Sequence, residues 1–298
     1  MCRLFGMSAG VQRAKATFWL LDAPDSLSAQ SRREPDGTGL GWFDAEGKPH
    51  ISKQPVAAYA DLDFATRAHK VASRTFVAHI RFASTGALEL RNTHPFEQAG
   101  RLFAHNGVIE DLPALEAHLG ASLSLVHGDT DSERFFALIT REIAASHGDV
   151  GAGIAVACKW VATSLPLFAI NFVLATAEGL WALRYPQTHE LYVLERLPGE
   201  KLEHMSSFGT RVSSDHGASR PLVTIASEKM DQDPAWRLLD SGELLHVSPT
   251  LGVSSRRILE ASPPRLLRLE DLTGRARESQ KKVPGQGTHH DVPPDHHD

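Results

Sequence analysis

The stretch Cys2-Arg3-Leu4-Phe5-Gly6-Met7-Ser8-Ala9 follows the initiator methionine directly and ends at Gly10. It is mostly apolar and carries a single charge, at Arg3, which is typical of a buried strand. We therefore expect a strand that begins at the second residue. This prediction places Cys2 at the start of a core element.

Further elements are predicted along the chain. Pro, Asp and Gly gather in residues 33–39, which predicts a loop leading into a strand at 40–43 and a turn at 44–47. Apolar residues at helical spacing predict helices at 60–73, 112–119 and 132–145, the last opened by a capping box from Thr130 to Glu133. Strands are expected at 75–81, 101–105, 170–175, 180–185, 191–195, 222–226 and 244–247.

The composition indicates one folded α+β domain. Hydrophobic residues make up 42% of the 298 residues and charged residues 22%, close to globular averages. No linker or fixed-period repeat divides the chain, so the domain is expected to span residues 2–273. From residue 274 the composition becomes polar, which predicts a disordered tail over 274–298. The tail contains His289, His290, His296 and His297, which we interpret as solvated rather than metal-binding; no metal or cofactor is assigned.

Charge and hydropathy limit the kinds of partner that the protein is expected to bind. The formal net charge is −5 and the Lys and Arg residues are scattered, so no footprint for nucleic acid is present. The apolar segment 151–183 is interrupted by Lys159, Pro166 and Glu178, which favours a core segment over a membrane span. The N-terminus lacks the features of a secretory signal, so a cytoplasmic location is expected.

The two cysteines must be explained singly, because two are too few for a disulfide framework or a cysteine-based zinc site. Cys158 lies in an apolar run and is expected in the core. Removal of Met1 would make Cys2 the N-terminal residue, with an α-amine of pKa about 8 beside a thiol of pKa about 8.5. One residue would then supply both nucleophile and base. Taken alone, Cys2 fits a buried structural cysteine at least as well.

Five further segments favour a catalytic Cys2 over a structural one. They are Arg33-Glu34-Pro35-Asp36-Gly37, His79-Ile80-Arg81-Phe82-Ala83-Ser84-Thr85, Asn92-Thr93-His94-Pro95-Phe96, His105-Asn106-Gly107-Val108-Ile109-Glu110 and Gly128-Asp129-Thr130-Asp131-Ser132-Glu133. Together with the opening Met1-Cys2-Arg3-Leu4-Phe5-Gly6, and over roughly residues 2–250, the chain resembles the class II glutamine amidotransferases. The stand-alone γ-glutamyl amidohydrolases of ergothioneine and glutathione metabolism are the most similar type. This resemblance implies a four-layer αββα N-terminal-nucleophile hydrolase sandwich of two antiparallel sheets.

The reaction implied by the resemblance assigns roles to four residues besides Cys2. Attack of Cys2 on a γ-amide creates an oxyanion, which Asn106 and the Gly107 backbone could stabilise, with glycine allowing a backbone turn. A plain Asn-Gly turn is the alternative. A glutamyl substrate also carries an α-carboxylate and an α-ammonium, for which Arg81 and Asp131 are suited. Asp131 could also serve as a helix cap, and Arg81 could be a surface charge.

The remaining motif residues have less definite roles. Ser84 and Thr85 are predicted to hold the glutamyl group, although several relatives have Thr-His at this point. We interpret His79, His94 and His105 as hydrogen-bonded packing residues, and expect the Asp36-Gly37 pair to shape the loop over the cleft. Glu110 either orients Asn106 or is solvated.

Three hypotheses for function follow. In the first, Cys2 forms a γ-glutamyl thioester from glutamine and releases ammonia, which would pass to a separate synthetase subunit. In the second, the substrate is a larger γ-glutamyl conjugate of ergothioneine or glutathione metabolism, with a peptidase as a possible partner, and hydrolysis is itself the purpose. The third is a catalytically silent binding or regulatory subunit, which the intact motif segments disfavour.

Overall fold

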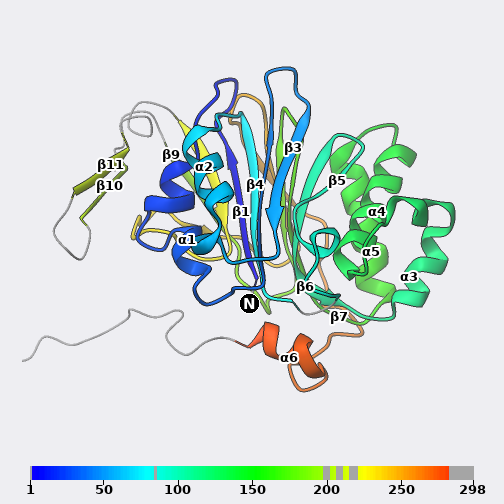
Figure 1. The fold of residues 1–298 in the computed structure, drawn as a ribbon. Coiled ribbons are helices and arrows are strands. Elements are labelled where there is room, and N and C mark those ends of the chain that lie inside the picture. The colour runs from blue at the N-terminus through cyan, green and yellow to red at the C-terminus, as the bar shows by residue number, and fades with distance from the viewer. Residues whose placement is uncertain (1, 84–85, 197–201, 206–210, 215–220, 282–298) are drawn as a thin grey trace, which may run out of the picture.

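Two antiparallel sheets stacked face to face form the body of the protein (Figure 1). The computed structural model describes residues 2–83, 86–196, 202–205, 211–214 and 221–281, with side chains omitted at 202–205 and 211–214. No helix in these ranges is long and apolar enough to cross a membrane.

Each sheet is antiparallel throughout. The first sheet has the strand order β13 (Arg237–Leu238), β9 (Tyr192–Arg196), β12 (Leu222–Ala226), β1 (Arg3–Ser8), β4 (Thr75–Arg81), β2 (Gly37–Phe43) and β3 (Pro49–Gln54). The second has the order β15 (Val253–Arg257), β14 (Glu243–Val247), β8 (Leu180–Arg184), β7 (Leu167–Ala175), β6 (Arg101–Ile109) and β5 (Phe96–Gln98). A separate hairpin pairs β10 (Leu202–Met205) with β11 (Arg211–Ser214).

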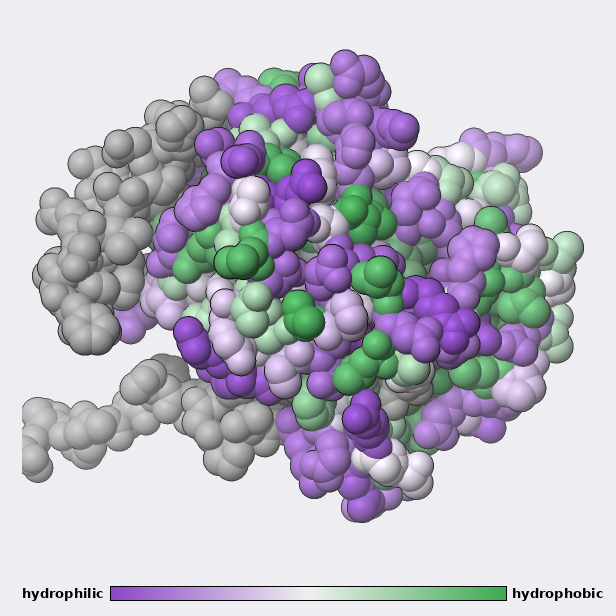
Figure 2. Space-filling view, viewed as in Figure 1, coloured by the Kyte–Doolittle hydropathy of each residue, from purple (hydrophilic) through white to green (hydrophobic). Residues whose placement is uncertain are grey.

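Helices cover the outer face of each sheet and complete four layers, as expected (Figure 1). The first sheet is covered by the π-helix η1 (Phe18–Asp22), α1 (Leu27–Gln30), the 3-10 turn η2 (Ala58–Ala60) and α2 (Leu62–Lys70). The second is covered by α3 (Leu112–Leu119), the 3-10 helix η4 (Gly120–Leu125), α4 (Asp131–Ala145) and α5 (Val150–Ser164). On the face seen in Figure 2, hydrophobic side chains gather in small groups separated by hydrophilic ones.

Strand β1 is central in its sheet, and its alternating side chains determine where Cys2 lies. Phe5 and Met7 point outward into the helix-covered core, whereas Leu4 belongs to the core between the sheets. A Cβ on Gly6 would lie 2.8 Å from Val173 of the second sheet, so the two sheets approach closely at this point. Cys2 has the same parity as Leu4 and therefore faces the second sheet. The predicted strand is confirmed.

Strands β2 and β6 extend beyond their predicted bounds. Residues 37–39, expected in a loop, belong to β2, because its glycines leave room for the segment that contains His94 and Pro95. A Cβ on Gly39 would overlap the His94 carbonyl oxygen. Strand β6 continues through Asn106 and Gly107 to Ile109 rather than ending at 105, so the alternative of a plain Asn-Gly turn is wrong.

The C-terminal segment packs beside the end of β6. Leu272 is buried against Val108, and helix α6 (Gly274–Gln280) follows it (Figure 1). The buried Gln280 Oε1 lies 2.5 Å from His189 Nε2, which fixes the end of the helix. Disorder predicted from residue 274 is therefore wrong for 274–280, because tertiary contacts order a segment whose composition is polar. Residues 282–298, with the four tail histidines, lie outside the described residues.

Candidate active site

The Cys2 thiol is buried at the start of β1 and is held by the backbone of the neighbouring strand. Its Sγ accepts a hydrogen bond from the Phe82 N–H at 3.2 Å and lies 3.3 Å from the Phe82 carbonyl oxygen, to which it donates. Burial raises the pKa of the Cys2 thiol, while the Phe82 backbone and the Arg81 charge act in the opposite direction. The thiol is therefore fixed in position but needs a base to become a nucleophile.

Asn106 reaches Cys2 from the opposite sheet. Its Nδ2 donates to the Cys2 carbonyl oxygen at 3.1 Å, and the side chain is buried. An amide nitrogen has two N–H groups, so one can keep this bond while the other points elsewhere. The Asn106 Oδ1 is buried without a hydrogen-bond donor among the described residues. Buried polar atoms of this kind are uncommon and call for an explanation, which a ligand-binding role would give.

Gly107 is required for a different reason from the one expected. It lies in extended β6 backbone opposite Ile170, where a Cβ would overlap the carbonyl oxygen of Ala169 on β7. Close approach of the neighbouring strand, rather than a turn, excludes a side chain here. The glycine thus keeps β6 and β7 close together directly beside Asn106.

Arg81 lies at the end of β4, in register with Gly37 of β2, and only 3% of it is exposed. Its Nη1 donates to the Ala87 carbonyl oxygen at 3.0 Å. Burial lowers the Arg81 pKa, and the charges of Cys2, Asp36 and Asp131 partly offset that effect. The alternative of a surface charge is wrong, because this guanidinium is enclosed and surrounded by the predicted site residues.

The Asp36-Gly37 pair ties the segment after β4 to the start of β2. The Asp36 carboxylate accepts a hydrogen bond from the Ala83 N–H at 3.0 Å, and the Asp36 N–H donates to the Arg81 carbonyl oxygen at 3.1 Å. A Cβ on Gly37 would press against Arg81 at 3.3 Å. Ser84 and Thr85, predicted to bind substrate, lie outside the described residues.

Asp131 is the first residue of α4 and connects this helix to β6. One carboxylate oxygen accepts from the Ile109 N–H at 2.9 Å and the other from the Ser132 N–H at 2.9 Å. The helix cap itself is Thr130, whose side chain accepts from the Glu133 N–H at 3.2 Å. Asp131 is therefore a rigidly held carboxylate within electrostatic reach of Arg81.

A buried charge cluster behind Cys2 was not foreseen from the sequence. The Arg3 guanidinium lies 2.7 Å from a Glu228 carboxylate oxygen and 3.6 Å from one of Glu34, and its Nη1 donates to the Cys2 carbonyl oxygen at 3.3 Å. Arg3 and Glu34 are nearly inaccessible. The one available signal was a charged residue inside an apolar strand. Arg3 and Asn106 thus donate to the same carbonyl oxygen of Cys2.

The three motif histidines are all buried, but their environments differ. His105 Nδ1 lies 2.9 Å from the Ser132 hydroxyl, which confirms a hydrogen-bonded packing role. The rings of His79 and His94 lie 4.2 Å apart, and neither forms a hydrogen bond with another described side chain. The prediction of a hydrogen bond is wrong for His94, whereas the backbone of His105 lies close enough to the His79 ring to act on its pKa. Burial, with the Arg81 charge, lowers the His79 pKa to about 3, so both rings serve as neutral packing groups.

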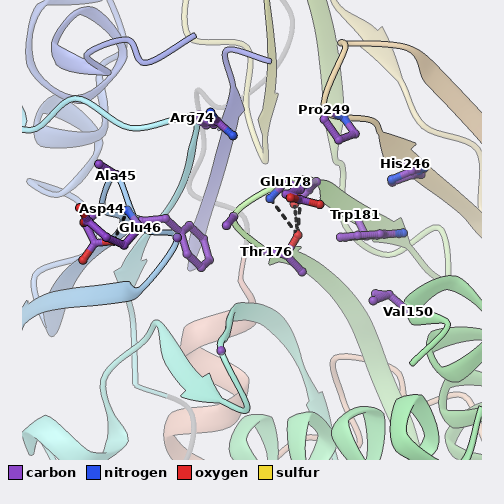
Figure 3. A pocket seen from close by; sticks show the side chains of 15 residues that line it. Asp44, Ala45, Glu46, Arg74, Val150, Thr176, Glu178, Trp181, His246 and Pro249 are labelled. Carbon is purple, nitrogen blue, oxygen red and sulfur yellow. Dashed lines mark hydrogen bonds between the residues drawn. The ribbon is translucent and has the colours of Figure 1, made fainter. Parts of the chain in front are cut away.

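A cavity of about 770 Å³ lies at the other end of the sandwich (Figure 3). It opens between the turns after β2 and β7, where Trp181 and His246 stack at 4.6 Å. Arg74 on its wall directly precedes β4, whereas Arg81 ends that strand. The cavity is thus separate from Cys2, Arg81 and Asp131.

The four-layer sandwich, with a cysteine at the start of a central strand, is the fold of the N-terminal-nucleophile glutamine amidotransferases. The chain superposes on the glutamine phosphoribosylpyrophosphate amidotransferase from B. subtilis with a TM-score of 0.61 and 20% identity, covering 88% of this chain and 50% of that one. It superposes on a glutamine aminotransferase class-II domain protein from Silicibacter pomeroyi with a TM-score of 0.57 and 20% identity, covering 86% and 99%.

The chain belongs to the class II glutamine amidotransferases, since the profile of that family matches residues 1–258. It is also 30% identical over 259 residues to the gamma-glutamyl-hercynylcysteine sulfoxide hydrolase of Mycolicibacterium smegmatis, covering 83% of this chain and 96% of that protein. The resemblance seen in the six motif segments is thereby confirmed. The protein is an enzyme of the amidohydrolase type.

Proposed function

We propose that the protein hydrolyses the γ-amide of a γ-glutamyl compound through a thioester on Cys2, after removal of Met1. The observation that carries this proposal is the 3.1 Å contact between Cys2 and Asn106, which brings nucleophile and oxyanion donor together from two different sheets. Arg81 on the adjacent strand and Asp131 on α4 supply the opposite charges that a glutamyl α-carboxylate and α-ammonium need.

The chemistry follows from the state of the thiol. Because burial raises its pKa, little thiolate exists near neutral pH, and the proton must leave as Sγ attacks. The α-amine of processed Cys2, with a pKa of about 8, is the base within the same residue. Asn106 Nδ2 and the Gly107 N–H would stabilise the oxyanion, an effect of about 3 kcal/mol for each good donor.

The proton then passes to the departing amine, and a γ-glutamyl thioester remains on Cys2. Water attacks this thioester with the α-amine as base, which restores the thiol and releases a γ-carboxylate. Glutamine would give ammonia, and a γ-glutamyl conjugate would give the amine to which it was joined. The Mycolicibacterium relative, named as a hydrolase of such a conjugate, supports hydrolysis as the purpose of the reaction.

A glutamine-analogue diazo-ketone tests the nucleophile. Intact mass of the processed protein should show a single adduct, which peptide mapping places on Cys2. Cys158→Ser is the matched control. The Cys158 thiol is fully buried between the second sheet and its covering helices, so its replacement should leave labelling unchanged. Cys2→Ser should abolish it. A processed protein that remains unlabelled, or one labelled equally after Cys2→Ser, would contradict the mechanism.

A blocked N-terminus tests the base. An extension that cannot be removed keeps the Cys2 thiol but converts its α-amine to an amide, so turnover should be lost. Full activity of the extended protein would show that another group accepts the thiol proton.

A further inference from the structure

Helix α6 places one cation, Arg275, at the edge of the site. The helix is held on one side by Leu272, buried against Val108, and on the other by the buried Gln280 beside His189. Val108 is two residues beyond Asn106 on the same strand. The helix is therefore anchored next to the strand that carries the proposed oxyanion donor, and Figure 1 shows it beside the chain's N-terminal end.

Arg275 itself faces solvent. It is exposed, whereas Ala276 on the same helix packs on the apolar cluster of Val108 and Leu272. No described residue forms a hydrogen bond or an ion pair with it. Arg277, by contrast, uses its guanidinium to bond the Leu269 and Glu270 carbonyl oxygens, which fixes the turn before the helix.

The Arg275 charge acts on Arg81. Burial is the main cause of the lowered Arg81 pKa, and repulsion from Arg275 lowers it further. Asp36 and Asp131 partly neutralise Arg81, whereas no described acidic residue forms an ion pair with Arg275. Two like charges that separate elements hold close enough to repel each other are unfavourable until an anion binds between or beside them. The arrangement suits a ligand with two separate negative groups.

Glutamine has one carboxylate, and in the proposed function Arg81 binds it. We propose that Arg275 is a specificity-determining residue that binds a carboxylate on the amine side of the scissile γ-amide. The preferred substrate is then a γ-glutamyl amino acid or peptide rather than glutamine. This inference rests on the proposed function and adds to it the chemical class of the leaving group.

Substrates that differ in a single charge test this inference. γ-Glutamylglycine and γ-glutamylglycinamide share the glutamyl group and the amide but differ in the second carboxylate, and glutamine lacks the glycine part. A charged hydrogen bond contributes about 1.5–3 kcal/mol, so kcat/KM for γ-glutamylglycine should exceed that for the glycinamide by roughly 10- to 100-fold. The difference should lie mainly in KM, because the carboxylate is bound before and during the reaction.

Arg275→Gln should reduce this preference by about the same factor, and Arg275→Lys should restore part of it. Arg256→Gln is the matched control. It removes an equal charge from an exposed position on β15, at the far edge of the second sheet, and should leave the preference unchanged. Circular dichroism and thermal unfolding verify that the three variants fold.

The outcomes separate the two proposals. An equal loss of kcat/KM for all three substrates in Arg275→Gln would assign Arg275 to the glutamyl group or to the fold, and an unchanged preference would remove it from recognition. Either result overturns the inference but leaves the Cys2 mechanism standing. If the wild-type enzyme hydrolyses none of the substrates and Cys2 is not labelled by the diazo-ketone, the proposed function fails, and this inference fails with it.

Discussion

Replacing His79 by Phe should make the folded protein more resistant to acid. His79 is fully buried, its ring contacts that of His94, and neither of its nitrogens is bonded to a described side chain. Phe has a similar shape and no polar atoms. Removing an unsatisfied buried polar group is neutral or stabilising, so the free energy of unfolding near neutral pH should change little.

The magnitude follows from the two pKa values. Burial, the Arg81 charge and His105 lower the His79 pKa to about 3 in the folded protein, against about 6.5 in the unfolded chain. The unfolded chain therefore binds a proton that the folded protein refuses. The stability that depends on a neutral His79 is fully present above about pH 6.5 and is lost as the pH falls toward 3. A pH of about 5 lies roughly 1.5 units below the pKa of the unfolded chain, so at this pH the free energy of unfolding has fallen by about 2 kcal/mol.

Urea unfolding between about pH 7 and pH 5, followed by tryptophan fluorescence, measures this loss. The wild-type protein should lose about 2 kcal/mol more than His79→Phe over that range. His127→Phe is the matched control, because His127 is exposed and its substitution leaves the buried His79 in place. Equal pH dependence in wild type and His79→Phe would show that His79 binds its proton in the folded protein and would refute the reasoning.

Three other substitutions follow from close contacts. Asn106→Ala should lower kcat by about 100- to 1000-fold with a smaller change in KM, as steady-state kinetics would show; unchanged kcat would remove Asn106 from the oxyanion site. Gly39→Ala should destabilise the protein by about 3 kcal/mol in urea titrations, because the new methyl group overlaps the His94 carbonyl oxygen; a wild-type midpoint would mean that the 93–95 segment moves freely. Arg3→Met should cost about 3–5 kcal/mol by removing a buried cation from Glu34 and Glu228, and adding Glu34→Gln should recover part of that loss; strictly additive losses would contradict the coupling.

Many helices and strands could be predicted from the sequence, because a local pattern of apolar and capping residues is enough to indicate them. The apolar run behind Met1 predicted β1, and the capping box at Thr130 predicted the start of α4 to within a residue. Helix α5 was missed, because its even hydrophobicity gives no amphipathic period. The sequence predicts a loop at residues 37–39 of β2 because the reason for the glycines, the segment lying across them, is more than fifty residues away in the chain.

Some features of the candidate site could be predicted from the sequence and others could not. Cys2, Arg81, Asn106 and Asp131 could be singled out from the sequence, since their chemical types match an amide, an oxyanion and two charged groups. Their motifs also identified the family. The contact between Cys2 and Asn106 could not be predicted, because it depends on how two sheets pack against each other.

The opening stretch by itself determined that a cysteine begins a buried strand, since apolar alternation is a local property. The tertiary structure decided what surrounds that cysteine. Arg3 is a lone charge in the sequence, yet it lies between Glu34 and Glu228, which come from distant segments. Arg275 belongs to a segment predicted to be disordered, and packing of α6 beside β6 brings it near the site. Burial and charge pairing depend on distances in space, and these are fixed only when the separate segments fold together.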